Sequence, residues 1–384
     1  MIKLKQVSRI FLSLFIVAFI ISASSLSVSA APKKVKVSAS TLNDGFQFTF
    51  DGMPSTSSSS PIKTYKGKTL GFSGIQNFDI TPDGKYIFTA SKCYTGSDMH
   101  TMLTRCSFPK RTGTGSTAAF EDVMILGNYG HGEVLAITQD NMDVESYNLW
   151  VGCDPEKKVD RHATSIARLT YEIDPDGKGK IVKTVKIKGF KNANVKNGKS
   201  AYFRDKVSPK WVIAAVDESS NQIVFRLRFP DGYGCTYLSY DFDKINSALN
   251  KLDNKGVYQI KKAAKWQRAR IRWHRSIQSF DVDGTNLYVA DGLKGTNAYI
   301  YVMHYKKQSN KKLSDQNKTD NNCSKIITII PKITIKGVKY TKKDLEIEGV
   351  KVNKLSNGKI NYYFNFLRAG TGLRDTQSLH MITK

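Results

Sequence analysis

Apolar and polar residues alternate along most of the chain in a hairpin pattern that recurs five times. In each copy an apolar strand leads into a turn containing Asp or Asn, and an aromatic-rich strand follows. The copies begin at Ile75, His131, Trp211, Ile277 and, more loosely, Leu345. Their turns fall near Asp83, Asp140, Asp217, Asp283 and Asn357, at intervals of 57, 77, 66 and 74 residues. This spacing is too long for a solenoid repeat and is typical of four-stranded β-propeller blades with long outer loops.

The repeat predicts an all-β fold, a β-propeller for which five blades fit the length best and six are the alternative. The copies are most alike at 75–79 and 277–281, and both of these end in Phe-Asp. A weaker echo at 377–381 lies at the extreme C-terminus. A propeller must close into a ring, so we expect this last inner-strand-like motif to complete a blade begun at the other end.

Two further elements stand out from the pattern. Residues 46–50 alternate cleanly and predict a strand. Residues 243–252 place Ile245, Leu249 and Leu252 on one helical face, with Asp243 as the N-cap. We expect this helix to pack outside a blade as an insertion.

The N-terminus has the pattern of a targeting segment. Basic residues precede an apolar run at 10–21, and Val28-Ser29-Ala30 is typical of a cleavage site. Residues 1–30 therefore predict a signal peptide and secretion, with a retained membrane anchor as the alternative. We expect 31–63 to be a basic, Ser-rich extension and 64–384 to be the propeller, with no transmembrane segment in the mature chain.

The net charge of the chain restricts the classes of partner that it is expected to bind. The formal net charge is +26, and removal of the basic residues Lys3, Lys5 and Arg9 with the signal peptide leaves +23. Folding does not need such an excess, since like charges repel in the compact state. It predicts a polyanionic partner, namely a cell-wall polymer or membrane surface of target bacteria, rather than a specific nucleic acid. A solubility adaptation is the alternative.

Five cysteines are too few and too scattered for a fold built on disulfides. Cys93 and Cys106 flank one predicted hairpin and could pair across it. The chain contains no CxxC motif, so we expect neither a zinc nor a redox site, and no cofactor.

The densest positive charge lies at 261–275, a stretch with seven Lys or Arg residues and no acidic residue. Guanidinium groups bind phosphate in a bidentate manner, and indole rings stack on sugar faces or bases. The alternative is that one Trp is core and the basic residues form a solvated face. The residues predicted to bind an anion or glycan are Lys261, Lys262, Lys265, Trp266, Arg268, Arg270, Arg272, Trp273 and Arg275.

Two other groups of residues invite a catalytic interpretation. His131 and Glu133 flank a glycine at a strand start, although a tight turn with a backbone-bonded His is the favoured explanation. Asp79 and Asp281 occupy matching positions in the repeat, and paired carboxylates are what a glycosidase uses. Repetition of the same Phe-Asp in two blades favours a structural role for them.

No GxSxG, HExxH or Walker motif occurs in the sequence. The Asp-rich segments at 174–177 and 281–284 lack the calcium-loop spacing.

Several phrases resemble the helveticin J family of large class III bacteriocins. They are FDITPDGKYIFTAS at 78–91, GHGEVLAI at 130–137 followed by YNLWVGCDP at 147–155, FDKINSALNKL at 242–252, and LEIEGVKV and NYYFNF at 345–352 and 361–366. The resemblance runs from about residue 71 to the C-terminus. It implies secretion and inhibition of related Gram-positive bacteria without cell-wall hydrolysis, and it supplies no catalytic residues.

These observations predict a secreted, bacteriocin-like protein that binds the anionic envelope of related Gram-positive bacteria and is not an enzyme. The alternatives are a secreted glycoside hydrolase of the five-bladed propeller type, and a non-toxic lectin or adhesin that binds wall polymers.

Overall fold

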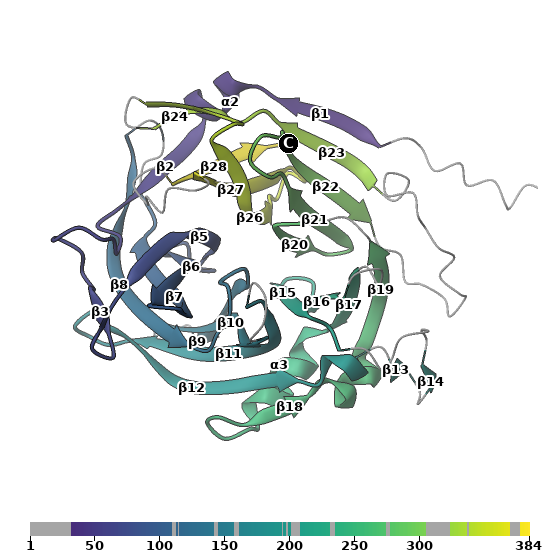
Figure 1. The fold of residues 1–384 in the computed structure, drawn as a ribbon. Helices are drawn as coiled ribbons and strands as arrows, with labels where there is room; N and C mark the ends of the chain where they lie inside the picture. The colour runs from purple at the N-terminus through teal and green to yellow at the C-terminus, as the bar shows by residue number, and fades with distance from the viewer. Residues whose placement is uncertain are drawn as a thin grey trace, which may run out of the picture.

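The computed structural model describes residues 32–109, 113, 115–141, 145–156, 161–193, 195–196, 199–200, 208–230, 235–273, 277–304, 323–335, 338–368 and 377–384. The signal peptide expected at 1–30 lies outside these residues. Each of the five predicted hairpins is the start of an antiparallel sheet, and the sheets form a five-bladed β-propeller. Figure 1 looks down the ring, with α3 and β12 at its lower edge.

The blades follow one another along the chain. Blade 1 contains β5 (Gly71–Ile80), β6 (Tyr86–Thr95), β7 (Asp98–Ser107) and β8 (Thr117–Gly127). Blade 2 contains β9 (Leu135–Asn141), β10 (Ser146–Pro155), β11 (Ala163–Ile173) and β12 (Gly179–Lys188), with β18 (Val257–Gln259) added at its edge. Blade 3 contains β15 (Trp211–Asp217), β16 (Gln222–Arg228), β17 (Cys235–Asp241) and β19 (Gln267–Trp273). Blade 4 contains β20 (Ser279–Asp283), β21 (Asn286–Asp291), β22 (Ala298–His304) and β23 (Cys323–Ile329). Blade 5 contains β26 (Leu345–Lys354), β27 (Ile360–Arg368) and β28 (Ser378–Thr383).

The first strand of every blade lies innermost, and each inner strand neighbours the next around the ring. The inner strands β5, β9, β15, β20 and β26 contact one another in that order, and β26 contacts β5 to complete the circle. All five predicted turns connect an inner strand to the second strand of its blade. The blade count of five is therefore confirmed.

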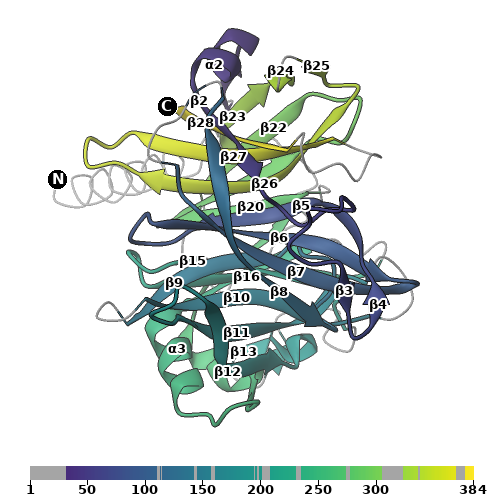
Figure 2. The same ribbon diagram turned by 90° about the vertical axis from the view of Figure 1, so that its left-hand side faces the viewer.

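The N-terminal strand closes the ring. Strand β2 (Phe46–Asp51), predicted from its alternation, runs antiparallel to β28 and parallel to β8. It thereby completes blade 5 and joins it to blade 1 in one eight-stranded sheet, as the neighbouring labels in Figure 2 show. The echo at 377–381 lies in β28, the third strand of blade 5, so the expectation that the chain ends on an inner strand was wrong.

Segment 31–63, expected as an extension ahead of the propeller, also contributes β1 (Lys33–Val37), which pairs in parallel with β23. Between β1 and β2 lies the short helix α2 (Ala39–Asp44), capped by the Ser38 side chain. The remaining short elements are β3 (Thr64–Tyr65), β4 (Lys68–Thr69), β13 (Val195–Lys196), β14 (Lys199–Ser200), β24 (Lys332–Ile335), β25 (Val338–Thr341), η1 (Phe190–Asn192) and η2 (Ile260–Trp266).

The predicted helix is α3 (Phe242–Asn250), an insertion between the third and fourth strands of blade 3. Ile245 and Leu249 are buried, as expected. The N-cap is Asp241 rather than Asp243, because the Asp241 carboxylate accepts a hydrogen bond from the Lys244 amide at 3.2 Å. Within the described part of the chain, no helix combines the length and the apolar character needed to cross a membrane.

Aspartates of the inner strands join neighbouring blades. The Asp79 carboxylate in blade 1 accepts a hydrogen bond from the Ile137 amide in blade 2 at 2.8 Å. In the same way, the Asp281 carboxylate in blade 4 accepts from the Val352 amide in blade 5 at 2.8 Å. The matching Phe-Asp pairs of the repeat therefore act as inter-blade ties, as the structural interpretation predicts.

Lys351, on the inner strand of blade 5, forms ion pairs with both of these aspartates. Its ammonium lies 3.1 Å from Asp79 and 3.8 Å from Asp281; the Lys351 and Asp281 side chains are buried, and that of Asp79 is half-buried. Burial raises the pKa of Asp281 to about 7, against the opposing charge of Lys351. The cation therefore compensates two carboxylates that would otherwise face each other in a water-poor interior.

We predict that Lys351→Met lowers the free energy of unfolding at pH 8 by about 3–5 kcal/mol, because it leaves buried carboxylates without a counter-charge. The deficit should shrink when the pH is lowered to 5, since protonation of the aspartates then removes the unpaired charge. Denaturant unfolding at both pH values measures this. Exposed Lys359→Met in the same blade is the control, and an equal effect of the two substitutions would contradict the role assigned to Lys351.

The possible disulfide between Cys93 and Cys106 is absent, and all five cysteines are buried thiols. In the register of β6 and β7, Cys93 lies opposite His100 and Cys106 lies opposite Ile87. The two cysteines are thus near opposite ends of the hairpin, roughly 20 Å apart at about 3.4 Å per residue. A disulfide needs Cα atoms within about 7 Å, so this prediction was wrong.

Candidate functional site

A cluster of buried charged groups lies at the end of the ring where the inner strands begin. His131 and Glu133 directly precede β9, and His162 lies between the second and third strands of blade 2. Lys92 is near the end of the second strand of blade 1, and Glu348 is near the start of β26. In an antiparallel blade these positions all fall at the same end. We call these five residues the axial cluster.

Two glycines shape the turn that carries His131 and Glu133. Gly130 and Gly132 have φ values of +82° and +89°, a region that glycine adopts without strain. A Cβ on Gly132 would also lie 3.4–3.5 Å from the backbone of blade 1. The Asn77 side-chain amide donates to the Glu133 carbonyl at 2.8 Å and fixes the turn to the inner strand of blade 1. The expected tight turn is present, and it also places two functional side chains.

Glu133 is held between two imidazoles. Its Oε1 lies 2.9 Å from Nδ1 of His162 and forms an ion pair with Nδ1 of His131. Nε2 of His131 lies 2.8 Å from the Lys92 ammonium. Because an ammonium only donates, Nε2 of His131 is the acceptor of this hydrogen bond. Polar contacts therefore run from Lys92 through His131 to Glu133.

The His162 ring is fixed by stacking as well as by hydrogen bonding. It lies on the Trp211 indole with ring centroids 4.0 Å apart and planes inclined by 15°. The Arg226 guanidinium packs over the indole at 4.7 Å from its centroid. A ring held in this way is pre-oriented, which is what an active-site imidazole requires.

Glu348 enters the cluster through a β-bulge. The register of β26 against β27 shifts between Ile347 and Val350, so Glu348 and Gly349 form the irregular step. The Gly349 amide donates to the Asn365 side chain at 2.6 Å, and a Cβ on Gly349 would lie 2.7 Å from the same oxygen and 2.9 Å from Phe78. Bulges often re-aim a side chain next to a functional site.

The two buried carboxyl groups differ in protonation. Burial raises the pKa of Glu348 well above its ordinary value, and the neighbouring Glu346 carboxylate adds to this. Burial also acts on Glu133, but the charges and hydrogen bonds of His131 and His162 outweigh it and lower the pKa of Glu133 to about 2. Burial thus favours the protonated form of Glu348, whereas its two histidine neighbours favour the ionised form of Glu133. Carboxyl pairs whose pKa values are driven apart in this way are typical of acid and base assignments in enzymes.

Three of these side chains also have the donor set of a metal site. The ligand atoms of His131, Glu133 and His162 all lie within 4.8 Å of one another, a grouping that sequence patterns did not predict. The Lys92 ammonium adds positive charge beside His131, which opposes the binding of a cation here.

Of the residues in the axial cluster, sequence patterns singled out only His131 and Glu133. His162 was missed because 31 residues separate it from His131 and no motif marks it. Glu348 was missed because LEIEGVKV looks like an ordinary strand with a polar outer face. The one available signal was Gly349, which interrupts the alternation at the bulge.

The basic stretch at 261–275 lies far from the axis in the topology, in η2 and in the outermost strand β19 of blade 3. Lys261, Lys262 and Lys265 are exposed, and the Arg268 guanidinium donates to Asp241 at 2.9 Å. Trp266 packs partly against the core and lies parallel to Tyr258.

Four residues of this stretch are less fully described. Arg270, Arg272 and Trp273 belong to β19, and only their backbone is described. Arg275 lies outside the described residues. The structure thus places the stretch at the outer rim of the ring.

Comparison with known proteins shows a similarity of fold alone. No family model matches the chain, and no curated protein matches it in sequence. Among solved structures, a glutaminyl cyclase from Myxococcus xanthus is similar at 9% identity, with 92% of this chain and 98% of that chain covered and a TM-score of 0.39. A levansucrase from Bacillus subtilis is similar at 10% identity, with 86% and 88% covered and a TM-score of 0.38. At these values neither activity is transferred to this chain.

One expectation is corrected at this point. The sequence was interpreted as that of a non-enzymatic protein, whereas the similar structures just named are those of enzymes. The non-enzymatic interpretation is therefore set aside.

We predict that Glu133→Gln lowers the free energy of unfolding at pH 7 by about 3 kcal/mol. This energy corresponds to the lowering of the Glu133 pKa from 4.5 to about 2 in the folded protein. A carboxyl group with a lowered pKa stabilises the fold above its unfolded pKa. This contribution disappears as the pH falls through the folded pKa, so the two proteins should converge as the pH falls from 4.5 to 2.

Denaturant unfolding across this pH range tests the prediction. Glu172→Gln, at a surface position, is the matched control and should change stability little. A Glu133→Gln deficit that stays constant down to pH 2 would show that the ionised carboxylate is not its cause.

Proposed function

We propose that the protein is a glycoside hydrolase that cleaves an anionic carbohydrate polymer of the bacterial envelope at the axial cluster. The observation that carries the proposal is the pair of buried carboxyl groups in one cluster, Glu133 held by two imidazoles and Glu348 presented by a bulge. Glycosidases use such a pair, one group protonated and the other ionised.

In this proposal Glu348 acts as the acid. Its proton passes to the leaving glycosidic oxygen as the bond from that oxygen to the anomeric carbon breaks. Water then adds to the anomeric carbon and returns a proton to Glu348, so that atoms and charges balance over the cycle. Burial supports this role because it raises the pKa of Glu348 well above its ordinary value and so favours the protonated form.

Glu133 stabilises the positive charge that develops on the sugar. A carboxylate with a pKa of about 2 is a weak base, but it remains ionised throughout the working range of pH. Both imidazoles bond its Oε1, so Oε2 is the oxygen through which it would act on the sugar. His131 and His162 then serve as positioning residues, and Lys92 orients His131.

The charge of the protein supports an anionic substrate. A net charge of +26 attracts a polyanion and raises the rate of encounter. The exposed Lys261, Lys262 and Lys265 at the rim add a local positive surface. If residues 1–30 direct secretion, as the sequence predicts, the wall polymers of related Gram-positive bacteria are the polyanions within reach.

We predict that Glu348→Gln and Glu133→Gln each reduce sugar release by about 10²–10⁴-fold, since each removes one half of the acid and carboxylate pair. Release should also fall at alkaline pH, as Glu348 loses its proton. The measurement is the appearance of reducing ends from purified Gram-positive walls incubated with protein at several pH values.

Glu172→Gln is the control and should release sugar at the wild-type rate. The proposal fails if the wild type releases no sugar from any wall preparation. Release that survives in Glu348→Gln would also overturn it. A protein that binds walls in a salt-sensitive manner without releasing sugar would instead be the lectin considered above.

A further inference from the structure

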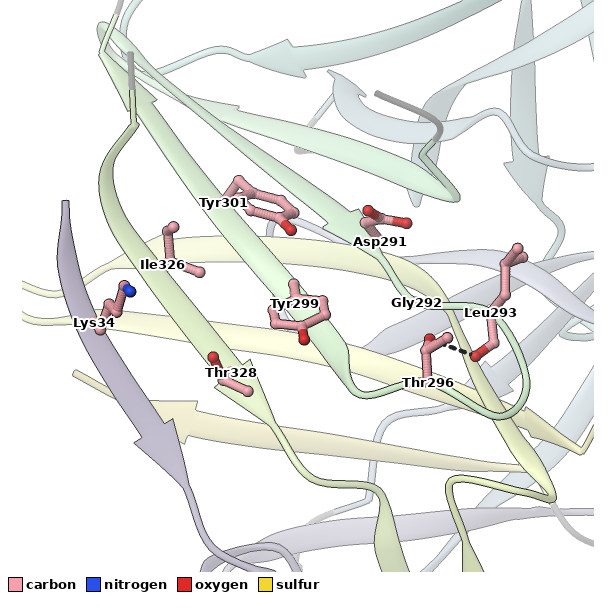
Figure 3. Close-up of a pocket in the computed structure, with 9 residues that line it drawn as sticks. All are labelled: Lys34, Asp291, Gly292, Leu293, Thr296, Tyr299, Tyr301, Ile326 and Thr328. Carbon is pink, nitrogen blue, oxygen red and sulfur yellow. Dashed lines mark hydrogen bonds between the residues drawn. The ribbon is translucent and has the colours of Figure 1, made fainter. Parts of the chain in front are cut away.

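A pocket lies on blade 4, over its outer strands. It has a volume of about 520 Å³, within the range of about 300–1,000 Å³ that is usual for small-molecule sites. Strands β1, β22 and β23 and the turn between β21 and β22 form its walls (Figure 3). The lining residues are Lys34, Asp291, Gly292, Leu293, Thr296, Tyr299, Tyr301, Ile326 and Thr328.

Two tyrosines form one wall of the pocket. Tyr299 and Tyr301 are two residues apart on β22 and therefore lie on the same face of the sheet, as Figure 3 shows. Their rings are stacked, with centroids 5.8 Å apart and planes inclined by 25°. Tyr299 is half-buried, so part of its ring is accessible from the pocket. An accessible aromatic face beside polar groups is suited to an amphipathic ring such as a pyranose.

Polar side chains surround the tyrosines. Thr296 and Thr328 supply hydroxyl groups, Asp291 supplies a carboxylate, and the exposed Lys34 supplies a cation at the rim. Thr296 is ordered by the hydrogen bond from its Oγ1 to the Leu293 carbonyl at 2.7 Å. Hydroxyl and carboxylate groups can satisfy sugar hydroxyls, and a lysine at the rim favours an anionic substituent.

The loop that lines the pocket is hydrogen-bonded to the strand that carries Glu348. The turn between β21 and β22 joins the second and third strands of blade 4, so it lies at the same end of the ring as the cluster. The Ile347 amide donates to the Gly292 carbonyl at 3.2 Å. Ile347 directly precedes Glu348, so the loop that lines the pocket is bonded to the strand that carries the acid.

We propose that this pocket is a subsite for a pyranose unit of the same polymer that the axial cluster cleaves, with the sugar ring against Tyr299. This inference rests on the proposed function for its choice of ligand. A chain bound here would lie across the end of the ring, with one sugar in the pocket and the scissile bond at Glu348. The subsite would fix the position of the polymer relative to the axial cluster, which itself offers few polar groups to bind it.

The test measures binding without cleavage. Glu348→Gln protein is titrated by calorimetry with tetrasaccharides of defined pyranose units, namely cellotetraose, maltotetraose and tetra-N-acetylchitotetraose. At least one should bind in a saturable manner. Tyr299→Ala in the same background should weaken that binding by 10-fold or more, because it removes the stacking face. Tyr299→Phe keeps the ring and should stay within about 3-fold of the parent.

Each result has a definite meaning. The subsite is overturned if no tetrasaccharide binds, or if Tyr299→Ala binds as well as Tyr299→Phe. Thermal unfolding of the two variants identifies a loss of binding caused by misfolding. Asp291→Asn, on the opposite side of the turn, gives a second variant that should also weaken binding. If wild-type protein releases no sugar but Tyr299-dependent binding persists, the subsite stands and only the catalytic proposal fails.

Discussion

Ring closure by β2 is the constraint on which the rest of the molecule depends. The strand pairs with β28 on one side and β8 on the other, so blades 5 and 1 become one sheet. The inner strands β26 and β5 contact each other only because the ring is complete. Lys351 strengthens the same junction, since its ammonium lies between Asp79 of blade 1 and Asp281 of blade 4.

The axial cluster exists only within the closed ring, because its members come from different blades. Blade 1 supplies Lys92, blade 2 supplies the turn before β9 and His162, and blade 5 supplies Glu348, while Trp211 of blade 3 stacks on His162. No blade alone contains both carboxyl groups. The opposed protonation of Glu133 and Glu348 is therefore a property of the assembled ring, in which burial and neighbouring charges act together.

The sequence predicts well those features that depend on neighbouring residues, and it does not predict those that depend on contacts between distant segments. The five turns, the strand at 46–50 and the helix after Asp241 follow from alternation, turn residues and capping, which act over a few positions. The site depends on contacts between distant segments, such as His162 with Trp211. The alternation of polar and apolar residues in β26 is that of a strand whose polar side chains face solvent. The Glu348 side chain is nevertheless buried. Likewise, two cysteines flanking a hairpin suggested a disulfide that the strand register forbids.

The pairing of β2 with β28 has a further consequence for how the chain reaches its native state. Phe46 lies opposite Met381, 335 positions later in the sequence. Contacts of such long range slow folding, because the entropy of closing a long loop must be overcome before they form. Blades 1 to 4 can form while the C-terminus is still being synthesised, but the edge of β2 that pairs with β28 stays open until the end. The protein is thus most vulnerable to aggregation just before its last strand pairs.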